Sequence, residues 1–298
     1  MKGLKLEGIL PALITPLQAD NRSINEKTVE RLMESLLRQG ADGFYILGGT
    51  GEGLVIGRAE REQMCELAVR CAAGRKPVVC HIASMNLDET LALARHAERV
   101  GCDAVASVPP FFFYYDAEDI YQYYKRIAGS VQIPVIIYYH PAAQREMKAE
   151  LIARIFEIDN VTGVKWSSGD LFEMMKLRLM TQGDMNIING PDELLLEGLT
   201  AGADAGIGST YNIMLPQFVR IYRLFREGRI EEARATQMRV NRVVEYLIRE
   251  EVIPSVKACA ELLGFEVGRA KFPMRQYSAE DCRRMEQELN RLGWPDFI

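Results

Sequence analysis

The sequence predicts an α/β protein, a (β/α)8 TIM barrel with a C-terminal helical extension. Three observations predict it. Short apolar runs alternate with amphipathic helical stretches, the same glycine-containing turn recurs between them, and the chain becomes wholly helical after Tyr211. Barrels of this class typically need about 250 residues, and the chain has 298. A doubly wound parallel sheet is the alternative arrangement of the same units.

The apolar runs are interpreted as eight parallel strands. They begin at Gly8, Gly43, Pro77, Ala104, Pro134, Val161, Met185 and Ala205. Each run is almost continuously apolar, which is typical of strands covered on both faces, as in an all-parallel sheet. The pattern therefore favours strands that alternate with helices over an antiparallel sandwich.

The stretches between the runs are interpreted as helices. In the first, apolar residues recur at the spacing of one helical face: Val29, Leu32, Met33, Leu36 and Leu37. The sequences Gly40-Ala-Asp-Gly43, Gly101-Cys-Asp-Ala104 and Gly202-Ala-Asp-Ala205 each follow a helix and precede a strand. Glycine just past a helix end adopts the left-handed conformation, and Asp suits a tight turn. We expect one type of αβ loop at all three places.

Two regions are expected along the chain, a catalytic barrel over 1–225 and a helical bundle packed on it over 226–298. Helices are predicted over 216–226, 230–251 and 256–263. A last helix follows Ser278, which has capping-box spacing to Asp281. No linker-like segment separates the two regions, so we expect the bundle to pack on the barrel.

Composition favours small-molecule chemistry. Apolar residues make up 48% and charged residues 26%, as in soluble globular proteins. A net charge of −5 argues against nucleic acid or an anionic membrane as partner. The six cysteines form no CxxC pair, and the N-terminus has no signal-peptide pattern, so we expect reduced thiols and a cytoplasmic protein. The three histidines lack metal-ligand spacing, and no metal is expected.

The residues that follow each strand are the candidates for chemistry, because active sites of such barrels lie at the carboxyl ends of the strands. The turn Gly48-Gly49-Thr50-Gly51-Glu52-Gly53 exposes backbone N–H groups that suit an anion, or is a simple tight turn. Tyr138 belongs to an aromatic strand end that is either a catalyst or a wall of the site.

Lys165 lies between Val164 and Trp166 in an apolar strand. Buried lysines are rare without a partner, so it is either salt-bridged, snorkelling, or a Schiff-base lysine. A nucleophilic amine needs a pKa below the ordinary value of about 10.4, and burial in a barrel lowers the pKa of an amine. Because the other lysines occur mainly in polar or helical contexts, Lys165 is the best single candidate.

The last two strands end in polar residues. Asp192 and Glu193 offer two adjacent carboxylates suited to a polyhydroxylated ligand, or they form a helix N-cap and an acidic first turn. After the eighth strand, Ser209 and Thr210 offer hydroxyl groups.

In combination, these motifs resemble the N-acetylneuraminate lyase and dihydrodipicolinate synthase family. They are the GGTGEG turn, the strand-end Tyr138, the GVKWSSGD segment with Lys165, and AGADAGIGSTYN from residue 201. The resemblance spans essentially the whole chain and is greatest to the N-acetylneuraminate lyase branch. It implies a pyruvate-dependent class I aldolase on a barrel, usually a homotetramer, that needs no cofactor and no metal.

The resemblance also implies residue roles. Lys165 would form the Schiff base, and Tyr138 would mediate proton transfer at the C4 hydroxyl. Gly49 and Thr50 would bind the pyruvyl carboxylate. The remaining substrate contacts would come from the sugar-facing residues Ser167, Gly190, Asp192, Glu193 and Ser209. The reaction expected is reversible cleavage of N-acetylneuraminate to N-acetylmannosamine and pyruvate.

Three departures from the family pattern bear on the substrate. Gly49 replaces a hydroxyl residue, and Phe112 stands where a tyrosine often reaches a neighbouring subunit's site. Where the synthase branch has an arginine for its aldehyde substrate, this chain has alanine, two residues before Arg145. These favour the lyase over dihydrodipicolinate synthase or another pyruvate-dependent 2-keto-acid aldolase, the alternatives. A catalytically silent sugar-acid sensor is a hypothesis of another class.

Overall fold

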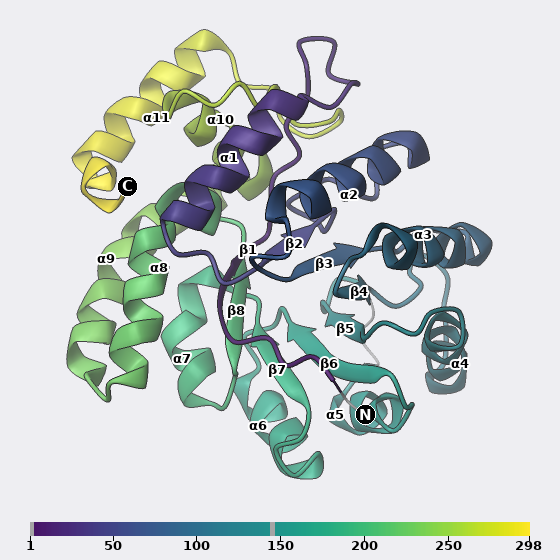
Figure 1. Cartoon of the computed structure of the whole chain (residues 1–298). Helices are drawn as coiled ribbons and strands as arrows, with labels where there is room; N and C mark the ends of the chain where they lie inside the picture. The colour runs from purple at the N-terminus through teal and green to yellow at the C-terminus, as the bar shows by residue number, and fades with distance from the viewer. Residues whose placement is uncertain (1–2, 144–146) are drawn as a thin grey trace.

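Each of the apolar runs forms a strand, and all of them pair in parallel (Figure 1). The computed structural model describes residues 3–143 and 147–298. The strands are β1 (Gly8–Pro11), β2 (Phe44–Ile46), β3 (Val78–His81), β4 (Ala104–Ser107), β5 (Val135–Tyr139), β6 (Val161–Trp166), β7 (Asn186–Asn189) and β8 (Ala205–Gly208). Their order is β1-β8-β7-β6-β5-β4-β3-β2. A parallel bridge between Ala12 and Tyr45 joins the two edges, so the sheet closes into the predicted barrel and the doubly wound alternative is wrong.

The helices form a ring outside the strands (Figure 1). They are α1 (Glu26–Arg38), α2 (Arg58–Ala72), α3 (Leu87–Val100), α4 (Ala117–Ala128), α5 (Ala149–Phe156), α6 (Leu171–Met180), α7 (Leu195–Thr200) and α8 (Tyr211–Arg226). A short 3₁₀ helix, η1 (Asp192–Leu194), precedes α7. The recurring turn is confirmed, since Gly40, Gly101 and Gly202 all have φ between 98° and 104°.

Three further helices complete the chain: α9 (Ile230–Arg249), α10 (Val252–Leu262) and α11 (Ala279–Arg291), followed by η2 (Trp294–Phe297). The capping box of Ser278 and Asp281 is confirmed. Helix α8 kinks at Met214, whose φ and ψ are non-helical, so the helix predicted over 216–226 is the part of α8 that follows the kink. Helix α9 packs along α8 (Figure 1). The boundary at residue 225 stays a prediction.

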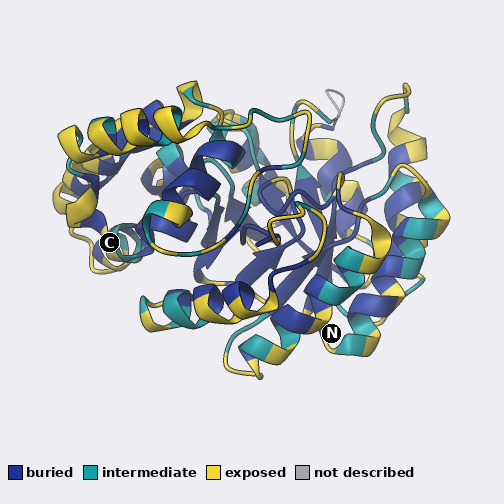
Figure 2. Ribbon diagram, turned by 90° about the horizontal axis from the view of Figure 1, so that it is seen from above, coloured by how far each residue is buried: buried dark blue, intermediate teal, exposed yellow. Residues whose placement is uncertain are grey.

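Two apolar cores lie on opposite faces of the barrel wall. Tyr45, Val79 and Tyr138 belong to the inner core, whereas Val164 and Trp166 belong to the outer core, between strands and helices. Figure 2 shows the buried strands surrounded by helices whose outer faces are exposed. Because side chains alternate along a strand, Lys165 must point into the barrel. None of the helices within the described residues is long and apolar enough to cross a membrane.

Candidate active site

Lys165 lies inside the barrel on β6, with 6% of its surface exposed. It is in register with Tyr138 on the neighbouring strand β5. Its Nζ lies 4.0 Å from the centre of the Tyr138 ring and 5.0 Å from that of Tyr45. Two aromatic faces therefore surround the amine.

Neither ordinary explanation of a buried lysine applies to Lys165. Among the described residues no carboxylate forms an ion pair with it, and its low exposure is inconsistent with snorkelling. Lys257 on α10 provides the contrast, because it is 1% exposed and its Nζ lies 2.5 Å from Oε1 of Glu52. A buried amine without a carboxylate partner is what a nucleophilic lysine requires.

Tyr45 and His81 complete the wall around Lys165 and Tyr138. The His81 ring lies 5.7 Å from the Tyr138 ring, nearly perpendicular to it. Burial lowers the pKa of His81 to about 3, so the imidazole is neutral. Its Nδ1–H donates to the carbonyl of Leu47, and Nε2 accepts from the backbone N–H of Val108. Neither residue was predicted from the sequence, although period-two alternation places both on inward-facing strand positions.

The glycine-rich turn after β2 is wound tightly and still exposes backbone donors. Left-handed φ values of 60° at Leu47 and 57° at Glu52 bend the chain. In the described part of the chain nothing accepts a hydrogen bond from the N–H groups of Gly49 and Thr50. The Thr50 hydroxyl lies 2.6 Å from that of Ser209, after β8. The turn thus presents two N–H groups and a hydroxyl pair to an anion such as a carboxylate.

A buried ion pair between Glu52 and Lys257 fixes the glycine-rich turn that follows β2. Both carboxylate oxygens of Glu52 are used, one by Nζ of Lys257 and the other by the backbone N–H of Lys271. Lys257 also donates to the carbonyl of Arg269. The C-terminal helix α10 therefore supports the turn that carries Thr50.

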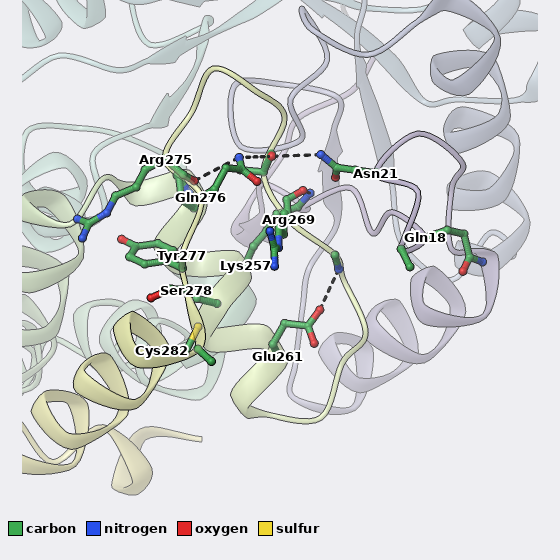
Figure 3. Close-up of a pocket in the computed structure, with 16 residues that line it drawn as sticks. Gln18, Asn21, Lys257, Glu261, Arg269, Arg275, Gln276, Tyr277, Ser278 and Cys282 are labelled. Carbon is green, nitrogen blue, oxygen red and sulfur yellow. Dashed lines mark hydrogen bonds between the residues drawn. The ribbon is translucent and has the colours of Figure 1, made fainter.

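A cavity of about 800 Å³ lies on the outer side of this ion pair, lined by Lys257, Arg269 and Arg275 (Figure 3). Arg275 is paired with Glu250 there. Among the described residues that line this cavity, Lys257 is the one lysine and it is paired with Glu52, whereas Lys165 is not a lining residue.

Asp192 is hydrogen-bonded to the segment that follows the neighbouring strand β8. Its Oδ2 accepts hydrogen bonds from both the backbone N–H and the hydroxyl of Thr210, at 2.7 and 2.6 Å. Asp192 is not an N-cap, because Pro191 occupies that position and η1 has no side-chain cap, but Asp192 and Glu193 do form the expected acidic first turn, that of η1. The Glu193 carboxylate is half-buried and accepts no hydrogen bond from the described residues.

The predicted site residues on β6 and β7 approach each other closely. A Cβ on Gly190 would lie 2.1 Å from the Ser167 hydroxyl, so only glycine fits there. Ser167 follows Lys165 by two residues and therefore lies on the same side of the wall. The structure thus brings Lys165, Tyr138, Thr50, Ser167, Gly190, Asp192 and Ser209 to the carboxyl ends of strands β2, β5, β6, β7 and β8.

Comparison with known proteins agrees with this geometry. The model of the dihydrodipicolinate synthetase family matches residues 5–292. The chain belongs to this family.

Named relatives in the family are N-acetylneuraminate lyases. The chain is 31% identical to the enzyme of Rhizobium meliloti, over 98% of the chain and 97% of that protein. It is 35% identical to the enzyme of Citrobacter koseri, over 85% of each. The solved N-acetylneuraminate lyase of Proteus mirabilis has a TM-score of 0.93 at 26% identity and covers 99% of the chain and 100% of its own. Solved dihydrodipicolinate synthases share the fold. Family and fold together support a pyruvate-dependent aldolase.

The three positions at which the chain departs from the family pattern differ in their structural environment. Phe112 is 84% exposed, has φ of 81°, and contacts the Phe113 ring. Ala143 carries no charge to the site, and Arg145 lies outside the described residues. Gly49 faces open space, since a Cβ added to it would meet no atom within 4 Å.

Gly49→Ser is expected to lower the KM for pyruvate by about two- to tenfold, the effect of one added hydrogen bond of about 0.5–1.5 kcal/mol. The φ of Gly49 is not left-handed, so serine fits without strain. Steady-state kinetics in the condensation direction measure it. Gly53→Ser is the contrasting variant of the same turn, because a Cβ there would lie 1.8 Å from the Leu47 carbonyl and should destabilise the fold. An unchanged or higher KM in Gly49→Ser would contradict the anion role of this turn.

Asp192 gives a pH-dependent prediction for stability. Burial raises its pKa from 3.8 to about 6. A raised carboxyl pKa stabilises the folded state below pH 4, and this contribution is lost as pH rises through 6. The free energy of unfolding of the wild type should therefore fall, relative to Asp192→Asn, by about 2 kcal/mol between pH 4 and 6. Urea denaturation across this range measures it, and a pH-independent difference would contradict the assignment.

Proposed function

We propose that this protein is a Schiff-base aldolase that cleaves N-acetylneuraminate reversibly to N-acetylmannosamine and pyruvate. The observation that carries the proposal is Lys165, a buried amine without an ion-pair partner among the described residues, opposite Tyr138 in the barrel. The carboxylate of the substrate would bind the N–H groups of Gly49 and Thr50. This arrangement directs the adjacent keto carbon toward Lys165.

The chemistry follows from this placement. Nζ of Lys165 attacks the C2 keto carbon of the open-chain sugar acid, and loss of water leaves an iminium. As the C3–C4 bond breaks, its electron pair moves to the iminium and forms an enamine, while C4 becomes an aldehyde. Tyr138 relays the C4 hydroxyl proton, which ends on C3 of the enamine. Water then hydrolyses the iminium, which releases pyruvate and restores Lys165.

The sugar chain would extend from Lys165 toward β7 and β8. The Glu193 carboxylate, which accepts no hydrogen bond from the described residues, is available to the hydroxyl groups of the sugar. One oxygen of Asp192 is held by Thr210, so the other is oriented for a substrate hydroxyl. Ser167, Gly190 and Ser209 would supply the remaining contacts.

The choice of lyase over synthase rests on the pocket and the named relatives. An uncharged Ala143 suits a neutral amino sugar better than an anionic amino-acid aldehyde. The curated relatives at 31% and 35% identity are N-acetylneuraminate lyases. Both observations support the same substrate class.

Tyr138→Phe is expected to lower kcat by about 10²- to 10⁴-fold, the usual contribution of a positioned proton-transfer group. Formation of the iminium with pyruvate should persist, because Lys165 keeps its aromatic surroundings. Turnover and borohydride trapping of the same variant measure the two steps. Equal loss of both would show that Tyr138 acts in forming the Schiff base and not in bond cleavage.

The substrate assignment is tested by offering each candidate separately. Release of pyruvate from N-acetylneuraminate, followed in a coupled assay, is the expected result. Faster condensation of pyruvate with aspartate semialdehyde would instead establish the synthase. A thermal shift with the sugar acid, without any turnover, would establish a sensor.

Assembly into a homotetramer is part of the proposal. Helix α6 exposes Phe172, Met175 and Leu179, and a second apolar patch surrounds Phe112. Exposed apolar patches mark interfaces, and a tetramer of two-fold symmetry uses two of them. Sedimentation of the purified protein measures the mass. Six free thiols support a reducing compartment, the cytoplasm.

A further inference from the structure

Three cysteines that are far apart in the sequence meet behind the barrel wall. Cys65 lies on α2, Cys80 on β3, and Cys102 in the turn between α3 and β4. All three are buried, with at most 4% of their surface exposed. Their Sγ atoms lie within 4.8 Å of one another, and those of Cys65 and Cys102 are 3.3 Å apart. These elements are neighbours in Figure 1.

The cluster is separate from the active site. Cys80 belongs to the outer core, whereas Val79 belongs to the inner core and the His81 ring faces Tyr138. Because side chains alternate along β3, the Cys80 sulfur points toward the helices and away from Lys165. The proposed aldolase reaction does not use these thiols.

We propose that Cys65, Cys80 and Cys102 form a three-thiolate site for a soft divalent cation. At the zinc–sulfur distance of about 2.3 Å, three sulfurs in a trigonal arrangement lie about 4 Å apart, and a larger soft cation spaces them somewhat further. The Cys65 and Cys102 sulfurs, 3.3 Å apart, would have to move apart by less than about 1 Å to reach this spacing, and all three pairs already lie within 4.8 Å. Binding forms three metal–sulfur bonds and releases the three thiol protons to solvent.

The charge of the surroundings favours a divalent ion. Arg61 lies one turn before Cys65 on α2, is 3% exposed, and interacts electrostatically with Cys80. Its guanidinium is held by the carbonyls of His81 and Ala83, both at 2.9 Å. Three thiolates, one divalent cation and one guanidinium sum to zero, which avoids an uncompensated buried charge.

The ligand set selects among divalent cations. No histidine or carboxylate of the described residues joins the three sulfurs. All-sulfur ligation favours soft metals, and zinc in structural sites takes four ligands. The geometry therefore points to a cation of the cadmium type, with zinc bound more weakly.

Cadmium titration tests the site. The reduced protein, kept in a phosphine reductant, should bind one equivalent of Cd²⁺ with a thiolate-to-metal charge-transfer band in the ultraviolet. The cadmium-113 chemical shift, which reports the number of sulfur ligands, should indicate three. Cys65→Ser, Cys80→Ser and Cys102→Ser should each weaken binding by more than about a hundredfold.

Matched controls come from the other cysteines. Cys259 is equally buried and Cys71 half-buried, and neither belongs to the cluster. Cys259→Ser and Cys71→Ser should bind Cd²⁺ as the wild type does. Absence of the band from folded wild type, its persistence in Cys80→Ser, or its loss in Cys71→Ser would overturn the proposal. If a serine variant does not fold, the cadmium-113 chemical shift of the wild type tests the proposal by itself, and a shift that does not correspond to three sulfur ligands would overturn it.

Discussion

Lys165→Ala is expected to lower the rate of pyruvate release by on the order of 10⁴-fold or more, because it removes the only group proposed to bond the substrate covalently. The variant should fold, since no ion pair or hydrogen bond among the described residues depends on the Lys165 amine. A coupled assay measures turnover, and circular dichroism checks the fold. Residual turnover within tenfold of the wild type would contradict covalent catalysis through Lys165.

Substitution of Lys165 by an apolar residue should not lower the stability of the fold. Lys165→Met keeps the volume and removes a buried polar group that has no ion-pair partner among the described residues, so the free energy of unfolding should stay unchanged or rise by up to about 2 kcal/mol. Urea denaturation at fixed protein concentration measures it. A large loss of stability would indicate a structural lysine.

Unlike Lys165→Met, Lys257→Met is expected to destabilise the protein, by about 3–5 kcal/mol. It leaves the Glu52 carboxylate, which has no exposed side-chain surface, buried without its cation. Since Glu52 holds the turn that carries Thr50, the KM for pyruvate should also rise. Urea denaturation and steady-state kinetics measure the two effects.

Two variants test whether the buried pair contributes more to stability than a partly exposed ion pair does. The double variant Glu52→Gln with Lys257→Met removes both charges and should recover most of the lost stability, because glutamine can still accept from the Lys271 N–H. Lys76→Met, whose partner Asp42 is 3.0 Å away and partly exposed, should change stability by less than about 1 kcal/mol. Equal effects of Lys257→Met and Lys76→Met would contradict the account of the pair.

The barrel and the buried position of Lys165 could be predicted because both depend on local patterns. Continuous apolar runs and glycine-ended helices indicate parallel strands and their connections. A lysine between Val164 and Trp166 stands out in such a strand, and period-two alternation then directs it inward. The capping box at Ser278 is likewise complete within a few residues.

The features that could not be predicted depend on contacts between distant segments. Lys257 lies in a helical pattern that gives no sign of its burial, and its partner Glu52 is on another element. The bonds between Asp192 in η1 and Thr210 form only when the segments that follow the paired strands β7 and β8 lie side by side. Cys65, Cys80 and Cys102 have no regular spacing, so nothing in the sequence indicates that the three thiols meet.

A Schiff base at Lys165 is measured most directly by reduction of the protein with borohydride in the presence of pyruvate, followed by proteolysis and mass mapping. A single pyruvate-derived adduct on the peptide that contains Lys165 is the predicted result. The peptide that contains Lys257, equally buried but ion-paired, serves as the internal control and should stay unmodified. Absence of an adduct, or an adduct on another lysine, would contradict a Schiff-base mechanism at Lys165.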